Sequence, residues 1–164
     1  MLARAMPQSD NSFFQSLTLS SEADTEALGR RVAALLAAGD TITLAGVLGA
    51  GKTVLARAVI RTFLPGAEVP SPTFTLVQTY DTKRFPIWHV DLYRVKALSE
   101  VRELGLDDVA ERGVLVIEWP DRMAAMLPAN RLDIVFEGGD EGDERTVKIV
   151  ARGDWAARIG HLSV

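Results

Sequence analysis

Gly46-Val47-Leu48-Gly49-Ala50-Gly51-Lys52-Thr53 decides the fold, because this stretch fits the phosphate-binding loop pattern G-x-x-x-x-G-K-[ST] at every constrained position. The five residues before it, 41–45, are apolar or β-branched and predict a buried strand. After it, apolar residues recur at helical spacing from Leu55 to Phe63 and stop at Pro65-Gly66, which predicts a helix. Strand, glycine-rich loop and helix, in this order, form the geometry that binds a polyphosphate.

Each residue type in the loop has a chemical role in that geometry. The glycines let backbone N–H groups turn toward the phosphates, and the helix N-terminus adds its positive end. Lys52 is expected to reach the β- and γ-phosphates, and the Thr53 hydroxyl to bind Mg²⁺. The alternative interpretation is a glycine-rich turn that carries a surface lysine, and the flanking strand and helix patterns argue against it.

Composition restricts the class of protein. The chain has 164 residues, of which 48% are hydrophobic, and this suits one compact domain with a full core. It contains no cysteine, which excludes disulfides and thiolate metal sites and agrees with a cytoplasmic protein. No apolar run is as long as a membrane span, so no membrane association is expected. The net charge is −4 and no Lys/Arg run occurs, so any RNA involved is expected to be contacted mainly by other proteins.

The pattern of apolar residues predicts an α/β sheet of the P-loop NTPase-like class, with a parallel centre, antiparallel flanking strands and a C-terminal hairpin. A helix is expected from Ser21 to Gly39, with Ser21 and Asp24 as a capping box. Besides 41–45, strands are expected at 75–80, 87–92, 114–117, 132–136 and 146–150. Residues 1–18 are interpreted as a flexible N-terminal arm and residues 19–164 as a single domain.

Two carboxylates follow predicted strands. Asp91 lies at the end of one and Glu118 directly after another, where the ligands of open α/β sheets bind. Both are therefore candidates for holding magnesium or orienting an attacking water, and the residues alone leave the division of roles open. The alternative is a solvated carboxylate at a strand end.

Three further features lie near these acids. His89 is two residues before Asp91 on the same strand face, and we expect it to hydrogen-bond near the carboxylate, because a histidine-based redox-metal site needs a second histidine that only His161 offers. Ser71-Pro72-Thr73 is either a rigid hydroxyl-bearing loop that senses the γ-phosphate or an ordinary proline-fixed surface loop. Trp119, taken alone, is interpreted as a core aromatic.

Four motifs in this order resemble the TsaE family, the small bacterial ATPases of tRNA threonylcarbamoyladenosine biosynthesis. They are Gly46–Thr53, Ser71-Pro72-Thr73-Phe74-Thr75-Leu76-Val77, His89-Val90-Asp91-Leu92-Tyr93-Arg94 and Ile117-Glu118-Trp119-Pro120. The likeness covers about residues 19–150. The arm before residue 17, the acidic hairpin tip and the tail after 153 depart from the family pattern, and none of them touches a nucleotide motif.

The resemblance implies a role for each matching position. The residues that would wrap the phosphates of ATP are Gly49, Ala50, Gly51, Lys52, Thr53 and Val54. Thr53 and Glu118 would bind Mg²⁺, and Asp91 would act near the γ-phosphate and the attacking water. Ser71 and Thr73 would form a switch-like loop, and Trp119 would be a functional aromatic beside the site. The adenine would lie near Ser20–Glu22 and Arg145.

The resemblance also implies a partner-dependent ATPase of low intrinsic activity that uses ATP and Mg²⁺. It would act with the TsaD and TsaB proteins, and reach tRNA indirectly through that complex, where TsaD modifies adenosine 37. The runner-up is a small-molecule P-loop kinase, although residues 121–131 offer only Arg122 and Arg131 for an arginine-bearing lid. A guanine-nucleotide switch is disfavoured because the N-K-x-D tetrapeptide of that class does not occur in the sequence.

Overall fold

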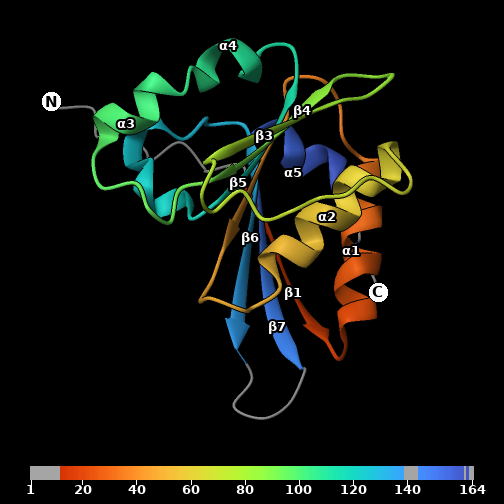
Figure 1. The fold of residues 1–164 in the computed structure, drawn as a ribbon. Coiled ribbons are helices and arrows are strands. Elements are labelled where there is room, and N and C mark those ends of the chain that lie inside the picture. Colours follow the sequence, from red (N-terminus) through yellow and green to blue (C-terminus); the bar gives the residue numbers. More distant parts are fainter. Residues whose placement is uncertain (1–11, 139–143, 161, 163–164) are drawn as a thin grey trace, which may run out of the picture.

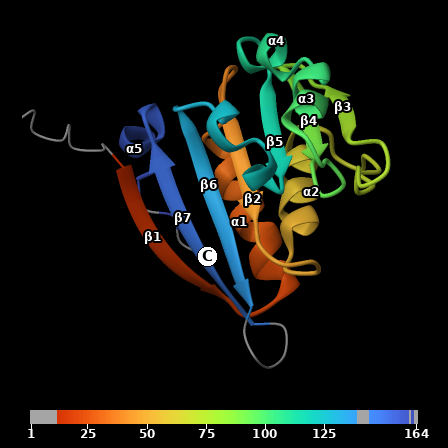
Figure 2. The same cartoon turned by 90° about the vertical axis from the view of Figure 1, so that its left-hand side faces the viewer.

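A seven-stranded sheet in the order β1-β7-β6-β2-β5-β4-β3 forms the framework of the protein (Figure 2). The structure is a computed structural model and describes residues 12–138, 144–160 and 162. The strands are β1 (Ser12–Leu19), β2 (Thr41–Ala45), β3 (Val77–Asp81), β4 (Pro86–Asp91), β5 (Val114–Glu118), β6 (Arg131–Gly138) and β7 (Arg145–Arg152). Strands β4, β5, β2 and β6 run parallel, while β3, β7 and β1 pair antiparallel to their neighbours. The predicted sheet with a parallel centre, antiparallel flanks and a C-terminal hairpin is confirmed.

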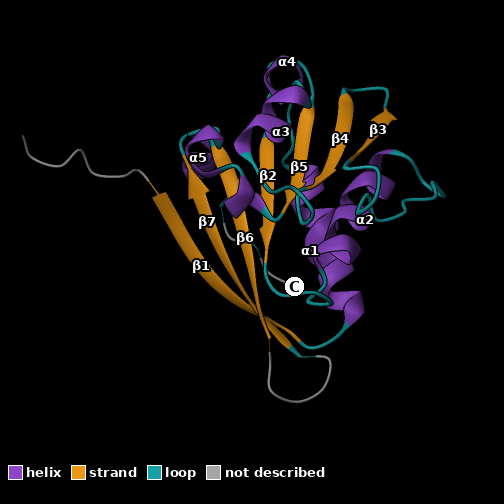
Figure 3. Ribbon diagram, turned by 60° about the vertical axis from the view of Figure 1, so that its left-hand side comes forward, coloured by secondary structure: helices purple, strands orange, loops and turns teal. Residues whose placement is uncertain are grey.

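Helices cover both faces of this sheet (Figures 1 and 3). They are α1 (Glu22–Ala34), α2 (Lys52–Phe63), α3 (Leu98–Glu103), α4 (Leu106–Ala110) and α5 (Asp154–Arg158), with 3₁₀ helices η1 (Pro120–Arg122) and η2 (Ala124–Met126). The apolar residues of α1, α2 and α5 share one core with one side of the sheet, and those of α3 and α4 share a second core with the other side of β4 and β5. None of the helices within the described ranges is long and apolar enough to cross a bilayer.

The central strands are buried on both sides, as a continuous apolar run requires. In β5, Val114 and Val116 face the α1–α2 core, and Leu115 and Ile117 face the α3–α4 core. Every residue of this strand is buried, including Glu118 at its carboxyl end. The alternation therefore places Glu118 on the α2 side of the sheet, the side on which the glycine-rich loop leads into α2.

The predicted flexible arm over residues 1–18 is wrong from residue 12 onward, because 12–19 form β1 and pair antiparallel with β7. Phe13 and Leu17 are half-buried against the core, and Leu19 is fully buried. Ser16 and Thr18 are exposed on the other face, but so is Phe14, and Gln15 shares the half-buried face, so the sequence shows no clear alternation of apolar and polar residues. Residues 1–11 and the hairpin tip at 139–143 lie outside the described residues.

The tail after residue 153 contributes a short helix that the sequence did not predict. Trp155 of α5 is fully buried in the α1–α2 core. Arg158 makes two 2.7 Å hydrogen bonds to the carboxylate of Asp40, and this contact raises the pKa of the guanidinium. Since Asp40 directly precedes β2, this ion pair ties the C-terminal helix to the strand that leads into the phosphate loop.

Helices α1 and α2 are in close contact at Gly29. A Cβ at this position would lie 2.7 Å from the Ala58 Cβ and 2.9 Å from the Leu55 carbonyl oxygen, closer than van der Waals contact permits. The absence of a side chain therefore sets the spacing of the two helices.

Gly29→Ala should destabilise the protein by about 1–2 kcal/mol, although alanine is by about 1 kcal/mol the better helix former. The added methyl group forces α1 away from α2. Urea unfolding measures the change, and the difference between Arg30→Ala and Arg30→Gly, at an exposed interior position of the same helix, calibrates the propensity difference. A Gly29→Ala variant as stable as the native protein would contradict the tight helix contact.

Candidate nucleotide-binding site

The glycine-rich loop joins the end of β2 to the start of α2 in a conformation that needs glycine. Gly49 and Gly51 have φ angles of 76° and 110°, and Gly51 is the N-cap of α2. At Gly46, where φ is 140°, a Cβ would lie 2.7 Å from the Phe136 carbonyl oxygen of β6. The loop therefore turns tightly against β6 at the N-terminus of α2, where free N–H groups favour an anion.

Lys52 is buried at the start of α2, with 5% of its surface exposed. Its Nζ donates hydrogen bonds to the carbonyls of Gly46 (2.6 Å) and Val47 (2.7 Å) and lies 4.4 Å from the ring centroid of Trp119. Burial lowers the pKa of the ammonium group, and the charges of Glu118 and Asp91 act in the opposite direction. The lysine is thus a pre-positioned cation between the loop and the two acids.

Asp91 and Glu118 lie side by side because β4 and β5 are parallel and pair Asp91 with Glu118. Both are buried, with 4% and 2% of their surfaces exposed. The Thr53 hydroxyl donates to Glu118 Oε1 at 3.1 Å, so the strand-end acid meets the loop threonine directly. The structure thus brings the two carboxylates together with Lys52 and Thr53, at the edge of the sheet where the sequence predicted them.

The 71–73 loop contacts the second acid. The Thr73 hydroxyl donates to Asp91 Oδ2 at 3.2 Å, and because its proton is used there, the Ser71 hydroxyl donates to Thr73 at 2.7 Å. The backbone N–H of Tyr93 donates to the other oxygen, Oδ1, at 2.9 Å. Asp91 therefore links the 71–73 loop to the loop that follows β4.

A cavity of about 190 Å³ collects these groups. It is lined by Leu48, Gly49, Gly51, Lys52, Thr53, Val54, Ser71, Thr73, Asp91, Glu118 and Trp119. One cation, two carboxylates and three hydroxyls thus face a space that adjoins the glycine-rich loop.

Trp119 is not the simple core aromatic that the sequence alone indicated. It lines the cavity, and its ring packs on Tyr93 with 4.9 Å between centroids. Its φ of 61° is rare for a residue with a side chain and directs the chain from β5 into η1. Neither the stacking partner Tyr93 nor Leu48 was assigned a role from the sequence, although both lie within recognised motifs.

His89 is fully buried on β4, and its Nε2 lies 2.6 Å from Oε2 of Glu118. The ring thus contacts a carboxylate, but that of Glu118 on the neighbouring strand and not that of Asp91, two residues along its own strand. In the described part of the chain, no group of three or more His, Cys, Asp or Glu side chains is arranged to hold a metal. Mg²⁺ commonly takes one or two carboxylates together with substrate phosphates and water. The Thr53 hydroxyl and Glu118 carboxylate are oxygen donors of that kind.

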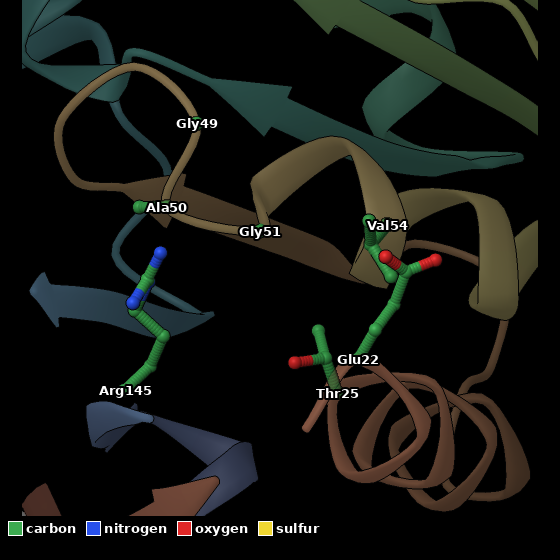
Figure 4. Close-up of a pocket in the computed structure, with 7 residues that line it drawn as sticks. All are labelled: Glu22, Thr25, Gly49, Ala50, Gly51, Val54 and Arg145. Carbon is green, nitrogen blue, oxygen red and sulfur yellow. The ribbon is translucent and has the colours of Figure 1, made fainter. Parts of the chain in front are cut away.

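A second cavity of about 190 Å³ lies on the other side of the loop, with Arg145 of β7 across from Glu22 and Thr25 of α1 (Figure 4). Gly49, Ala50, Gly51 and Val54 complete its lining. Glu22 and Arg145, expected near an adenine, are thus brought together, whereas Ser20 does not line this cavity. Thr25 was missed, and its position one helical turn after Ser21 was the available signal.

Comparison with known proteins identifies the family. The family model described as "Threonylcarbamoyl adenosine biosynthesis protein TsaE" matches residues 19–147. A protein named "tRNA threonylcarbamoyladenosine biosynthesis protein TsaE" from Rickettsia felis is 35% identical over 89% of this chain and 85% of its own length. The protein of that name from Bacillus subtilis is 36% identical over 80% of this chain and 82% of its own length.

The fold comparison agrees. A crystal structure of YdiB from Bacillus subtilis superimposes with a TM-score of 0.76 and 28% identity, over 90% of this chain and 93% of that one. The sheet, the loop and the strand-end acids thus belong to a P-loop NTPase-like fold. Because the family model spans most of the sequence and the relatives align over most of their lengths, the chain belongs to the TsaE family.

Proposed function

We propose that this protein is a Mg²⁺-dependent ATPase that acts as an accessory protein in threonylcarbamoyladenosine biosynthesis on tRNA, together with TsaD and TsaB proteins. The single observation that carries the ATPase proposal is the shared cavity of Lys52, Thr53, Asp91 and Glu118. Membership of the TsaE family supports the pathway.

ATP hydrolysis requires the protein mainly to position the reacting groups and to compensate the phosphate charge, because phosphoryl transfer involves little covalent chemistry by the protein. The loop N–H groups and Lys52 would bind the phosphates of ATP. Thr53 and Glu118 would hold Mg²⁺, which when bound compensates phosphate charge and orients the phosphate oxygens. Asp91, fixed by Thr73 and the Tyr93 N–H, would orient the attacking water.

Charge distribution supports an accessory role in a tRNA pathway. The chain carries 22 acidic against 18 basic side chains, and no basic run lies beside the loop. A protein that held tRNA by itself would need several phosphate contacts from Lys and Arg. We therefore assign the principal tRNA contacts to the partners.

The small-molecule kinase is less well supported. A kinase closes an arginine-bearing lid over the phosphates to exclude water. Among the described residues that line the cavity at Lys52, none is an arginine. Of the two candidates in 121–131, Arg131 is bound to Asp133 and to the Pro128 carbonyl.

Reconstituted tRNA modification tests the proposed function. The TsaD–TsaB complex is supplied in amounts well below those of the tRNA. Modification of more than one tRNA per complex should then require this protein and ATP. Replacing the ATP bound by this protein with a non-hydrolysable analogue should restrict modification to about one tRNA per complex. Modified adenosine is measured by mass spectrometry of digested tRNA. Equal yields without this protein, or phosphate transfer to a metabolite faster than ATP hydrolysis, would reject the proposal in favour of another role or of the kinase.

Lys52→Ala should lower ATP hydrolysis by about 10²-fold or more, because it removes the buried cation that offsets phosphate charge. Phosphate release and calorimetric ATP binding measure the loss. Lys148→Ala is the matched control, since Lys148 is a half-exposed residue of β7 that pairs with Glu137. Full hydrolysis by Lys52→Ala would discard the assignment of the loop.

Asp91→Asn should reduce turnover by about 10²-fold while the affinity for Mg²⁺ and ADP changes no more than about threefold. The amide keeps the size of the side chain and its acceptor for the Tyr93 N–H but loses the charge that orients water. Single-turnover hydrolysis and ADP calorimetry separate the two effects. A loss confined to nucleotide affinity would assign Asp91 to binding instead.

A further inference from the structure

His89 is a buried polar residue whose role the nucleotide contacts leave open. Its side chain is fully inaccessible, on the α2-facing side of β4 between Ile87 and Asp91. The ring makes one hydrogen bond within the described part of the chain, from Nε2 to Glu118 Oε2 at 2.6 Å, and Nδ1 is buried there without a partner.

An imidazole is a costly choice for this position. Burying a polar ring costs free energy unless its groups are hydrogen-bonded, and an apolar side chain of similar size would fill the same space without that cost. A ring with its proton on Nε2 donates to the carboxylate and leaves no N–H unpaired at Nδ1. The benefit of the histidine must therefore lie in its contact with Glu118.

This contact divides the two oxygens of Glu118 between two partners. Oε2 is held by His89, while Oε1 accepts the proton of the Thr53 hydroxyl at 3.1 Å and faces the cavity. Without the ring, the carboxylate could rotate about its terminal bond, and Oε2 would be buried without a donor. The ring thus fixes which oxygen is presented beside Thr53.

We propose that His89 is a positioning residue that holds Glu118 in the orientation in which Oε1 and the Thr53 hydroxyl together bind Mg²⁺. This rests on the proposed function, specifically on Glu118 as a magnesium ligand. His89 is not among the residues that line the cavity, and its one side-chain partner among the described residues is Glu118, so it acts through Glu118. Partners of this kind typically change metal affinity by about 10–100-fold.

The test compares two replacements of nearly equal size. His89→Gln keeps an N–H donor within reach of Glu118, and His89→Met fills the space without one. Calorimetry of ADP binding in Mg²⁺ and in EDTA gives the affinity gained from the metal, a quantity that does not depend on turnover. In His89→Met the magnesium-dependent gain in ADP affinity should be at least about tenfold smaller than in the native protein, and in His89→Gln it should stay within about threefold of the native gain. Affinity in EDTA should be unchanged in both.

Glu118→Gln separates this inference from the proposed function. If Glu118→Gln keeps the full magnesium-dependent gain, the metal assignment itself has failed. If Glu118→Gln loses the gain and His89→Met keeps it, the positioning role is overturned. Two outcomes would show that His89 is only a structural residue. In the first, His89→Met lowers the ADP affinity equally in Mg²⁺ and in EDTA. In the second, His89→Met and His89→Gln lose the same share of the magnesium-dependent gain. Should His89→Met not fold, His89→Asn, whose shorter amide does not span to Glu118, replaces it as the variant without the hydrogen bond.

Discussion

The parallel pairing of β5 with both β2 and β4 is the constraint on which the site depends. It sets Glu118 opposite Leu44 on one side and opposite Asp91 on the other. Because side chains alternate across a strand, a shift of β5 by one residue would turn Glu118 from the α2 side to the α3–α4 side of the sheet. The apolar residues before it, buried on both faces, resist that shift, so ordinary core packing fixes the position of the Glu118 carboxylate.

The same constraint gathers charged groups that are costly to bury singly. Lys52, Asp91 and Glu118 are each at most 5% exposed. Each has hydrogen-bonding partners: loop carbonyls for the lysine, hydroxyls for the two acids, and His89 for Glu118. Two negative charges face one positive charge around the cavity, which leaves room for a further cation. Under the proposed function that cation would be Mg²⁺, bound together with the nucleotide.

The sequence predicted what depends on short-range pattern. The glycine-rich loop is specified by eight consecutive residues. The two acids are specified by their position after strands that can be recognised from their own residues. What it missed depends on distant partners or on backbone conformation. The alternation of Phe13 and Leu17 has meaning only beside β7, and the packing of Trp155 only inside the assembled core. The positive φ of Trp119, which turns the indole toward Lys52, has no signature in residue type.

The sheet order also determines when the protein can fold as it leaves the ribosome. β2 has its two neighbours, β5 and β6, far downstream in the sequence, and β1 pairs with β7, which lies further along the chain still. Even the glycine-rich loop packs at Gly46 against Phe136 of β6. Long-range pairings of this kind are slow to form and leave early strand edges unpaired. The nascent chain must therefore carry Leu17 and Leu19 exposed through most of translation, and its nucleotide pocket is among the last features to be completed.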